Sequence, residues 1–294
     1  MKGYYKYLPI TKTETDWGFY INTVGYSITN PLEAYPPANH PSSHHFTWNK
    51  GRTLNGYYLV FISKGRGTFE SALTSPKTVS EGICFLLYPN VWHRYKPDLN
   101  TGWEEYWVGF NGMYPEHIIK NNFGDPENPF FEIGLNEPFL IAFQHLLESV
   151  RNGLPGYHQV ISGITLEMLA TLRNLSSGDY QCQDKDLQLI HKAKFILRES
   201  LEQAVDIPQM VKELPMGYSK FRKLFKEETG ISPHQYYLNL RINRAKSLLQ
   251  TTELNVNEVA FQSGFESEYY FSKFFKKKVN LSPTEYRSLK KQSR

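Results

Sequence analysis

Residues 1 to about 115 contain short runs of β-branched and aromatic residues separated by turn residues. This pattern predicts strands over Gly56–Ser63, Gly82–Tyr88 and Trp103–Phe110, with a turn at Lys64–Gly67 and a return strand beginning at Thr68–Ser71. Several short strands at this spacing are typical of a small barrel or sandwich. We therefore expect the first part of the chain to be a β domain.

After Asn111 the hydrophobic period changes to that of a helix. One apolar stripe is made by Phe139, Phe143, Leu146, Leu147 and Val150. After a break at Gly153–Gly156, a narrower stripe is made by Ile161, Ile164, Met168, Leu172 and Leu175. A narrow seam of this kind packs against the β domain or against a second copy of the chain, and the pattern leaves both open.

The rest of the chain predicts a linker and an all-helical domain. Residues 177–186 are polar with little to bury, and every long segment from residue 187 onward has a helical period. We expect a cupin-like barrel over 1–132, a helical packing or dimerisation segment over 133–176, the linker, and an all-α domain over 187–294. The fold class is α+β multidomain.

Two helix pairs in the second half have the form of helix-turn-helix units. In the first, Asp206 is expected to cap a short helix, Ile207–Leu214. Pro215–Gly217 would form the turn, since glycine tolerates a positive φ. A second helix follows over Ser219–Thr229 and ends at Gly230.

The second pair repeats this plan. Asn257 is expected to cap a short helix, Glu258–Ser263. Gly264 turns the chain, and Ser267 can cap the next helix, Glu268–Val279. The inward side chains of the short helix are predicted to be Val259, Ala260 and Phe261.

The two units share a sequence skeleton and a spine. The segment FKEETGISPHQYY (Phe225–Tyr237) reappears as FKKKVNLSPTEYR (Phe275–Arg287), and in both a Ser can cap a helix that begins with Pro. The helix between the units, Pro233–Leu249, is expected to join them rigidly. Its predicted inner side carries Leu238, Ile242, Ala245, Leu248 and Leu249, and its outer side Arg241, Arg244 and Lys246.

Charge and composition indicate the kind of partner and the cellular compartment to expect. Residues 184–294 carry 20 Lys and Arg against 13 Asp and Glu, whereas the rest of the chain is slightly acidic. A DNA-binding tail would show this asymmetry, although a solvated basic face would too. Cys84 and Cys182 have no metal-ligand spacing and favour a reducing compartment. No apolar run suits a signal peptide or a membrane span, so we expect a cytoplasmic protein without membrane contact.

The second unit resembles the DNA-binding domain of the AraC/XylS family of transcription regulators. The family pattern A-x-x-x-G-F-x-S-x-x-Y-F-x-x-x-F-K-K, followed by S-P-x-x-Y-R, is met by Ala260, Gly264, Phe265, Ser267, Tyr270, Phe271, Phe275, Lys276, Lys277, Ser282, Pro283, Tyr286 and Arg287. One departure is Asn280 in place of the usual Gly, and asparagine also adopts the left-handed conformation. The resemblance implies that the protein is a regulator and not an enzyme. It also implies that this regulator binds double-stranded promoter DNA, contacts RNA polymerase and forms a homodimer.

The resemblance also implies roles for outward side chains, because a recognition helix in the major groove presents polar residues to base edges. By position, the base-reading residues are Ser219, Arg222, Lys223, Glu268, Tyr269, Ser272 and Lys273. Lysines lack a fixed planar geometry, so Lys226, Lys276, Lys277 and Lys278 are expected to contact phosphates. The alternative is that these side chains form the solvated faces of a helical bundle.

The segment from Pro36 to Asn111 resembles the family's cupin-like effector barrel, and its W-x-x-Y-W-V-x-F strand is most similar to carbohydrate-sensing members. The resemblance implies an effector pocket at Arg52, Tyr95, Glu105 and Trp107, with Trp48, His45 and His93 as further lining candidates. Aromatic faces and bidentate polar groups suit a sugar. The plainer alternatives are a core role for Trp107 and a surface role for Arg52.

Histidines raise the question of a metal site, at His40, His44, His45 and His93. Metal-binding cupins use His-x-His, whereas the adjacent His44 and His45 would point to opposite faces of a strand. We therefore expect no metal and no cofactor. Two rival functions stay open: a metal-dependent cupin enzyme with a DNA-binding tail, and a regulator that works without a ligand. Burying Arg52 and Glu105 without a ligand would be costly, which argues against the second.

Overall fold

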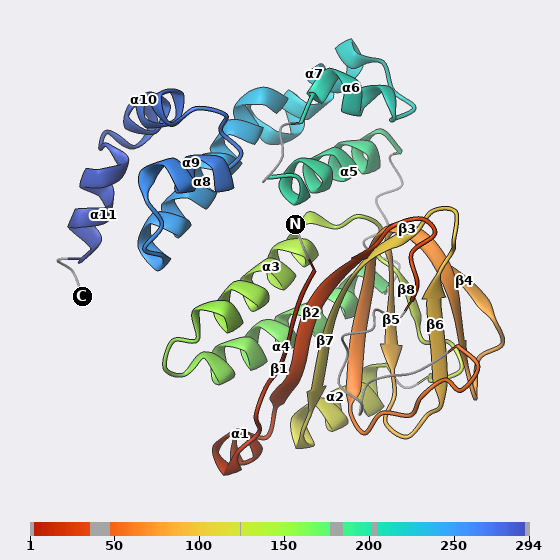
Figure 1. Ribbon diagram of the computed structural model, residues 1–294. Coiled ribbons are helices and arrows are strands. Elements are labelled where there is room, and N and C mark those ends of the chain that lie inside the picture. Colours follow the sequence, from red (N-terminus) through yellow and green to blue (C-terminus); the bar gives the residue numbers. More distant parts are fainter. Residues whose placement is uncertain (1–2, 36–47, 124, 177–184, 202–204, 292–294) are drawn as a thin grey trace. The chain divides into compact units, whose positions relative to one another are not determined.

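The computed structural model describes residues 3–35, 48–123, 125–176, 185–201 and 205–291. The chain divides into two compact units, Met1–Gln181 and Cys182–Arg294. The first is an antiparallel sheet with helices and the second is entirely helical among its described residues (Figure 1). This is the predicted α+β class. None of the described helices combines the length and hydropathy that crossing a membrane requires.

The strands of the first unit are β1 (Tyr4–Tyr7), β2 (Tyr20–Thr29), β3 (Tyr57–Ser71), β4 (Lys77–Ser80), β5 (Ile83–Leu87), β6 (His93–Pro97), β7 (Trp103–Asn111) and β8 (Phe130–Glu132). All pairings are antiparallel, in the order β1-β2-β7-β3-β5-β8, and β4 and β6 also pair with β3. The helices are α1 (Lys12–Trp17), α2 (Met113–Asn122), α3 (Glu137–Asn152) and α4 (Tyr157–Ser176). β5 and β7 are predicted strands that the structure confirms.

The predicted turn at Lys64–Gly67 is wrong, because β3 continues through it as one strand of 15 residues. Gly65 has a φ of 80°, and the register against β7 shifts between Ile62 and Lys64. The strand therefore bends at a bulge instead of reversing. Its first part pairs with β7 and β5 and its second part with β4 and β6, so the sheet curves around an interior core.

The two faces of the sheet bury different cores. The interior core includes Tyr58, Val60, Ile62, Phe69, Phe85, Tyr95 and Trp103. The opposite face packs on α3, where Phe61 contacts Phe139 and Tyr106 contacts Phe143, and α3 and α4 cover this face in Figure 1. The predicted stripe on α3 is fully buried there. Most of the α4 stripe is also buried within this chain, at Ile161, Ile164, Met168 and Leu172, so that stripe packs internally.

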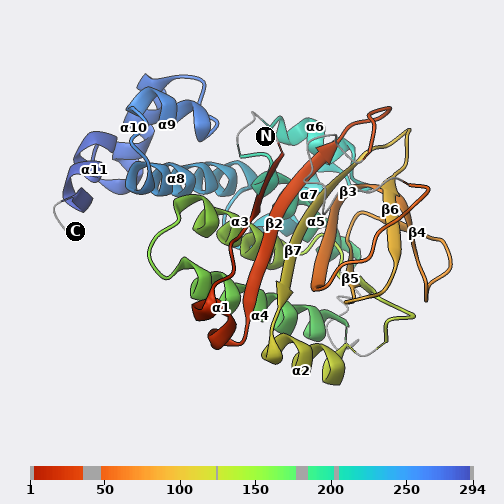
Figure 2. The ribbon, with the colours of Figure 1, turned by 60° about the horizontal axis from the view of Figure 1, so that its bottom comes forward.

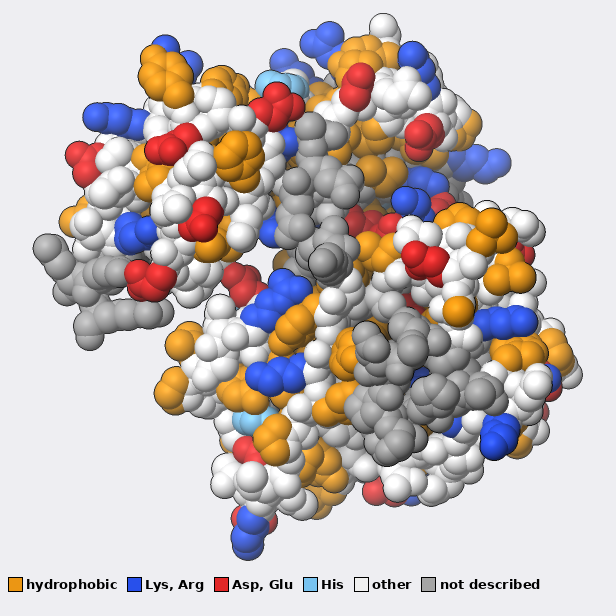
Figure 3. Space-filling model, in the orientation of Figure 1, with side chains coloured by type: hydrophobic (Ala, Val, Ile, Leu, Met, Phe, Trp, Pro, Cys, Tyr) orange, Lys and Arg blue, Asp and Glu red, His pale blue; other side chains and the backbone are white. Residues whose placement is uncertain are grey.

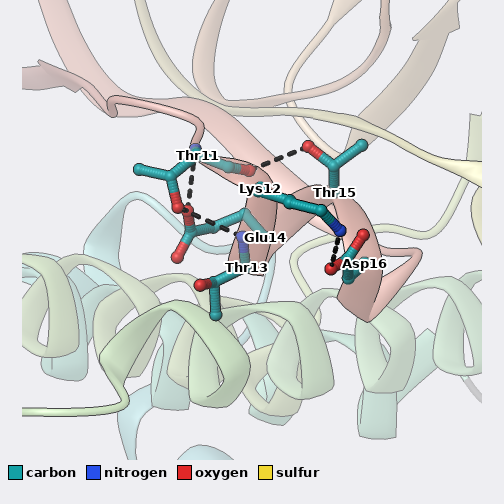
Figure 4. Close-up of polar contacts among 6 residues, drawn as sticks. All are labelled: Thr11, Lys12, Thr13, Glu14, Thr15 and Asp16. Atoms are coloured by element: carbon teal, nitrogen blue, oxygen red, sulfur yellow. Dashed lines mark hydrogen bonds and ion pairs between the residues drawn. The ribbon is translucent and has the colours of Figure 1, made fainter.

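Helix α1 has no hydrophobic period and was not predicted; polar side chains define it locally. The hydroxyl of Thr11 accepts a hydrogen bond from the Thr13 backbone N–H at 3.2 Å (Figure 4). In return, the Glu14 carboxylate accepts one from the Thr11 backbone N–H at 2.8 Å. This reciprocal capping box satisfies donors that a helix start leaves free. Lys12 and Asp16 add an exposed ion pair one turn apart.

The helices of the second unit are α5 (Lys185–Glu199), α6 (Ile207–Lys212), α7 (Tyr218–Thr229), α8 (Pro233–Thr251), α9 (Val256–Gln262), α10 (Glu268–Val279) and α11 (Pro283–Lys291). These helices pack around two separate hydrophobic cores. α8 contributes Tyr237 and Leu240 to the first core and Leu238, Ile242, Ala245 and Leu249 to the second. Figure 2 shows α8 extending from α5–α7 to α9–α11, which confirms the predicted spine. Residues 177–184 of the predicted linker lie outside the described residues, and α5 already includes its last two.

Helix caps are mostly where the sequence places them, with one error. Asp206, Ser232 and Ser267 cap α6, α8 and α10 as predicted. The cap of α9, however, is Asn255 and not Asn257. The Asn255 side chain accepts from the Glu258 N–H at 2.8 Å, and the Glu258 carboxylate accepts from the Asn255 N–H at 2.7 Å. This capping box starts α9 early enough to enclose Asn257.

The two interhelical turns differ from each other. Gly264 has a φ of 78°, as expected of a turn glycine. Gly217 has a φ of −70° and is the extended N-cap of α7, so the predicted left-handed role there is wrong. Phe261 was expected to be buried but is 53% exposed. Val259 and Ala260 occupy the inward face of α9, and a helix rotates about 100° per residue, which turns Phe261 outward.

The outer side of α8 also differs from the prediction. The guanidinium of Arg241 lies 4.3 Å from the ring centre of Tyr237 and 5.7 Å from that of Phe265. Arg244 donates a hydrogen bond to the Gln262 backbone carbonyl at 2.7 Å. Both arginines therefore contact residues of α8–α10 and not solvent alone, since their long stems pack while their heads find acceptors or rings.

Candidate functional site

The interior of the first unit brings together four of the predicted effector residues. Arg52 pairs with His93 through two backbone hydrogen bonds of 2.9 Å. Its Nη2 donates to the Tyr95 hydroxyl at 2.7 Å, and its Nε donates to Nε2 of His93 at 3.3 Å. Glu105 is 4% exposed and lies on the same interior face. The Arg52 side chain is thus turned toward this interior, where it contacts Tyr95 and His93, and is not a free surface charge at a strand start.

The acid–base state of this interior follows from burial. Burial raises the pKa of Glu105 to about 7, although the Tyr35 hydroxyl, Arg52 and the Trp103 indole each pull it back down. Burial, with Arg52 beside it, lowers the pKa of His93 to about 4. His93 is therefore neutral at neutral pH. Its Nδ1 lies 3.0 Å from the Val91 carbonyl, so Nδ1 carries the hydrogen and Nε2 accepts from Arg52.

The side chains on β7 alternate between the interior and the helical layer. Trp103, Glu105 and Trp107 project into the interior, whereas Tyr106 packs on α3. The partners of these three residues on β2 are small: Thr29, Ser27 and Gly25. A side chain at Gly25 would collide with the Trp107 ring at 2.4 Å. Small residues on one strand therefore leave room for large and polar ones on the other.

Not every predicted lining residue reaches this interior. Trp48 stacks under Arg94 and Lys96, at 4.5 Å and 4.2 Å from its ring centre. These two residues alternate along β6 with the inward His93 and Tyr95, so Trp48 lies on the outer face. Trp107 is half-buried and packs against Tyr5 as well as the interior. His45 lies outside the described residues.

Two interior residues were missed by sequence reasoning. Trp103 lies two positions before Glu105, and the same alternation that pairs Glu105 with Trp107 would have placed it in the site. Tyr35 donates a hydrogen bond from its hydroxyl to the Glu105 carboxylate at 3.1 Å. Tyr35 comes from a segment between β2 and β3 with no strand or helix period, so no sequence pattern points to it.

In the second unit, α7 and α10 present the predicted DNA-reading residues on their exposed sides. Ser219, Arg222, Lys223 and Lys226 are exposed on α7, while Phe221 and Phe225 are fully buried. On α10, Glu268 and Lys273 are exposed, Tyr269 is 77% exposed and Ser272 is half-buried. The last turn of α10 carries the exposed Lys276, Lys277 and Lys278.

These exposed side chains are lightly constrained. Arg222 lies 6.0 Å from the Tyr218 ring centre, and Lys223 is 3.9 Å from Glu227 one turn along α7. On the face drawn in Figure 3, basic and acidic side chains are interspersed over the helical unit. Surface ion pairs of this kind contribute little, so a nucleic acid can displace them at small cost.

Within the described residues, no group of three or more His, Cys, Asp or Glu side chains could hold a metal ion. His40, His44 and His45 lie outside those residues, so the question of a metal at these histidines stays a prediction. The free thiol of Cys84 is fully buried, and burial raises its pKa well above the usual value. A buried thiol of this kind is structural rather than reactive.

Comparison with known proteins matches both units. The profile of an AraC-like ligand binding domain matches residues 32–162, and that of a helix-turn-helix domain matches residues 210–288. The chain is similar to the MmsAB operon regulatory protein of Pseudomonas aeruginosa, with 27% identity over 238 residues, which are 79% of this chain and 75% of that protein.

Two further relatives also match over most of their length. The lactose operon transcription activator of Staphylococcus xylosus is 25% identical over 242 residues, covering 78% of this chain and 82% of that protein. The raffinose operon transcriptional regulatory protein of Pediococcus pentosaceus is 24% identical over 252 residues, covering 82% and 88%. These matches support a two-domain regulator and not the alternative of a cupin enzyme with a DNA-binding tail.

Proposed function

This chain belongs to the AraC/XylS family of transcription regulators, and from that premise we propose that a sugar or sugar derivative bound inside its sheet domain controls it. Two of its relatives are named for the lactose and raffinose operons. The observation that carries the proposal is that Arg52, Tyr95 and Glu105 converge on one interior, where Arg52 donates to the Tyr95 hydroxyl and burial raises the pKa of Glu105. A polyhydroxylated ligand supplies further donors and acceptors to these groups.

The proposed site divides sugar recognition between polar and aromatic side chains. Arg52 is directed by Tyr95 and His93 and can donate to adjacent ligand oxygens. Glu105 accepts from ligand hydroxyls, and Trp107 offers a flat face for C–H surfaces. A regulator that works without a ligand remains the second candidate, and the convergence of these polar groups on one interior disfavours it.

For DNA, we propose that α7 and α10 lie in successive major grooves. Arg222 reads guanine, because its fork matches the two acceptors of that base. Ser219, Lys223, Glu268, Tyr269, Ser272 and Lys273 are the other base-reading candidates, and Lys226, Lys276, Lys277 and Lys278 contact phosphates. The shared helix α8, packed into both cores, supports a fixed spacing between the two reading helices.

We further propose that the regulator works as a homodimer and contacts RNA polymerase at the promoter. The buried stripe of α4 is not free to form the dimer, so the exposed apolar residues Ile141, Val160 and Leu166 of α3 and α4 are the candidates. Leu166→Glu should shift the protein toward monomer in sedimentation equilibrium. An unchanged mass would exclude this surface.

Thermal unfolding with a panel of sugars tests the effector proposal. L-Arabinose, D-galactose, D-xylose, lactose and raffinose would each be added in excess. A ligand that binds only the folded state stabilises it by about 2.7 kcal/mol at a hundred times its Kd, which raises Tm by several degrees. Arg52→Ala should remove this effect, and Trp17→Phe, at an exposed residue of α1, should retain it. The absence of stabilisation by every sugar would overturn the proposal.

A further inference from the structure

The interior of the sheet domain contains buried polar atoms that no described residue satisfies. One is the indole Nε1–H of Trp103, a residue that is 2% exposed. Another is the hydroxyl of Thr29. Buried donors are rarely left without an acceptor, because the lost hydrogen bond to water is not replaced. In a ligand-binding domain, a ligand can supply the missing partner of such an atom where other buried polar groups share its face.

These two atoms belong to neighbouring residues on the wall that carries Glu105. Thr29 lies directly opposite Trp103 in the β2–β7 pairing, so both side chains project from the same face. Glu105 is two residues further along β7 and shares that face. The indole N–H faces the Glu105 carboxylate and lowers its pKa as a side-chain donor, but the contact falls short of the geometry of a full hydrogen bond.

The direction of the Trp103 N–H is fixed by packing on both sides of the ring. The indole lies edge-on to Tyr35 at 5.7 Å between ring centres and 6.0 Å from the Tyr95 ring. Its other side fills the space over Gly67, where an added Cβ would come within 2.6 Å of the ring. Because the ring has little freedom to turn, the N–H is a preorganised donor.

We propose that Trp103 and Glu105 together bind one hydroxyl group of the effector, with Thr29 contacting a neighbouring oxygen. An indole can only donate and an ionised carboxylate can only accept, and a hydroxyl does both at a single atom. A carbonyl would satisfy Trp103 alone and an ammonium group Glu105 alone. This inference rests on the proposed sugar-binding function and makes Trp103 a specificity-determining residue that selects a neutral polyol.

Indole N–H signals in a ¹H–¹⁵N spectrum test the proposal directly. The chain has five tryptophans, so the spectrum of Trp103→Phe identifies the Trp103 signal. We expect that signal to shift downfield as a stabilising sugar is added. Trp103→Phe should weaken sugar binding about tenfold, as expected for a lost hydrogen bond in a buried site. Trp17→Phe is the matched control at an exposed indole and should bind normally.

The outcomes separate this inference from the function on which it rests. If a sugar binds but leaves the Trp103 signal unmoved, the inference is overturned and the sugar-sensing function stands; a permanently bridging water would give this result. If none of the sugars binds, sugar sensing fails, and a titration of the wild-type protein with glycerol tests the hydroxyl site alone. A shift of the Trp103 signal with glycerol supports the site, and no shift overturns it.

Discussion

At the scale of single residues, burial in the interior of the sheet domain shifts the pKa values of two ionisable groups in opposite directions. Burial disfavours the charged form of each, so the pKa of Glu105 rises to about 7 and that of His93 falls to about 4. Both groups are therefore mainly neutral near pH 6, beside the permanently charged Arg52. A ligand that hydrogen-bonds to Glu105 favours its ionised form and would be bound more tightly as the pH rises through 7.

Glu105→Gln is expected to change how stability depends on pH. In the wild-type protein the folded state keeps the Glu105 proton up to about pH 7, whereas the unfolded state loses it near the ordinary pKa of 4.5. As the pH rises between those values, the wild type therefore loses unfolding free energy, by roughly 3 kcal/mol in total. Glu105→Gln has no such loss, so its stability relative to the wild type rises by the same amount. His93 is present in both proteins, so its contribution to the pH dependence cancels in the difference.

Urea unfolding followed by tryptophan fluorescence measures this difference, because all five tryptophans lie in the sheet domain. The transitions of both proteins would be recorded at intervals from about pH 4.5 to 8. A difference in unfolding free energy that stays constant over this range would show that Glu105 is ionised in the folded state throughout.

Arg222 and Lys277 should affect DNA binding in different ways. Removing a bidentate guanine contact with Arg222→Ala should cost about 1–3 kcal/mol on the preferred duplex and relax preference at one base pair. Lys277→Ala should weaken all duplexes alike. Binding to a duplex selected from a random library and to its single-base variants checks both. Equal losses on every sequence for both variants would contradict the division of roles.

At the scale of elements, local signals predict helices better than strand paths. The second helix-turn-helix could be predicted because the Ser267 cap, the turn glycine and the core phenylalanines lie within one short segment, although the cap of α9 was assigned two residues too late. β3 was misread because Gly65 suits a turn and a bulge equally, and only pairing with β4 and β6 decides between them. Tyr35 was missed for a related reason: the tertiary fold, and not a local pattern, brings it to Glu105.

The neighbouring asparagines of α9 provide a matched test of helix capping. Asn255→Ala removes the cap and should destabilise the second helix-turn-helix by about 1 kcal/mol. Asn257→Ala changes an exposed residue inside the helix and should be neutral or slightly stabilising. Hydrogen exchange of the α9 amides in the full chain measures the local effect. Equal exchange in the two variants would contradict the capping assignment.

At the scale of the whole molecule, the uneven charge of the chain has a measurable consequence. The helical domain carries the basic excess, and its four proposed phosphate contacts release counterions when DNA binds. The logarithm of the DNA association constant should fall with the logarithm of salt concentration with a slope of roughly −3 to −4. Lys277→Ala should reduce the slope by about 0.9. A flat salt dependence would exclude phosphate contacts as a main source of affinity.

The account as a whole depends on one coupling, between a ligand in the sheet domain and DNA held by the helical domain. Its most direct test is the Kd for the selected duplex, measured with and without a saturating concentration of the sugar that stabilises the protein. We predict a change in Kd of roughly fivefold or more, in either direction, that is absent in Arg52→Ala. A sugar that occupies the sheet domain and leaves the wild-type Kd unchanged would contradict it.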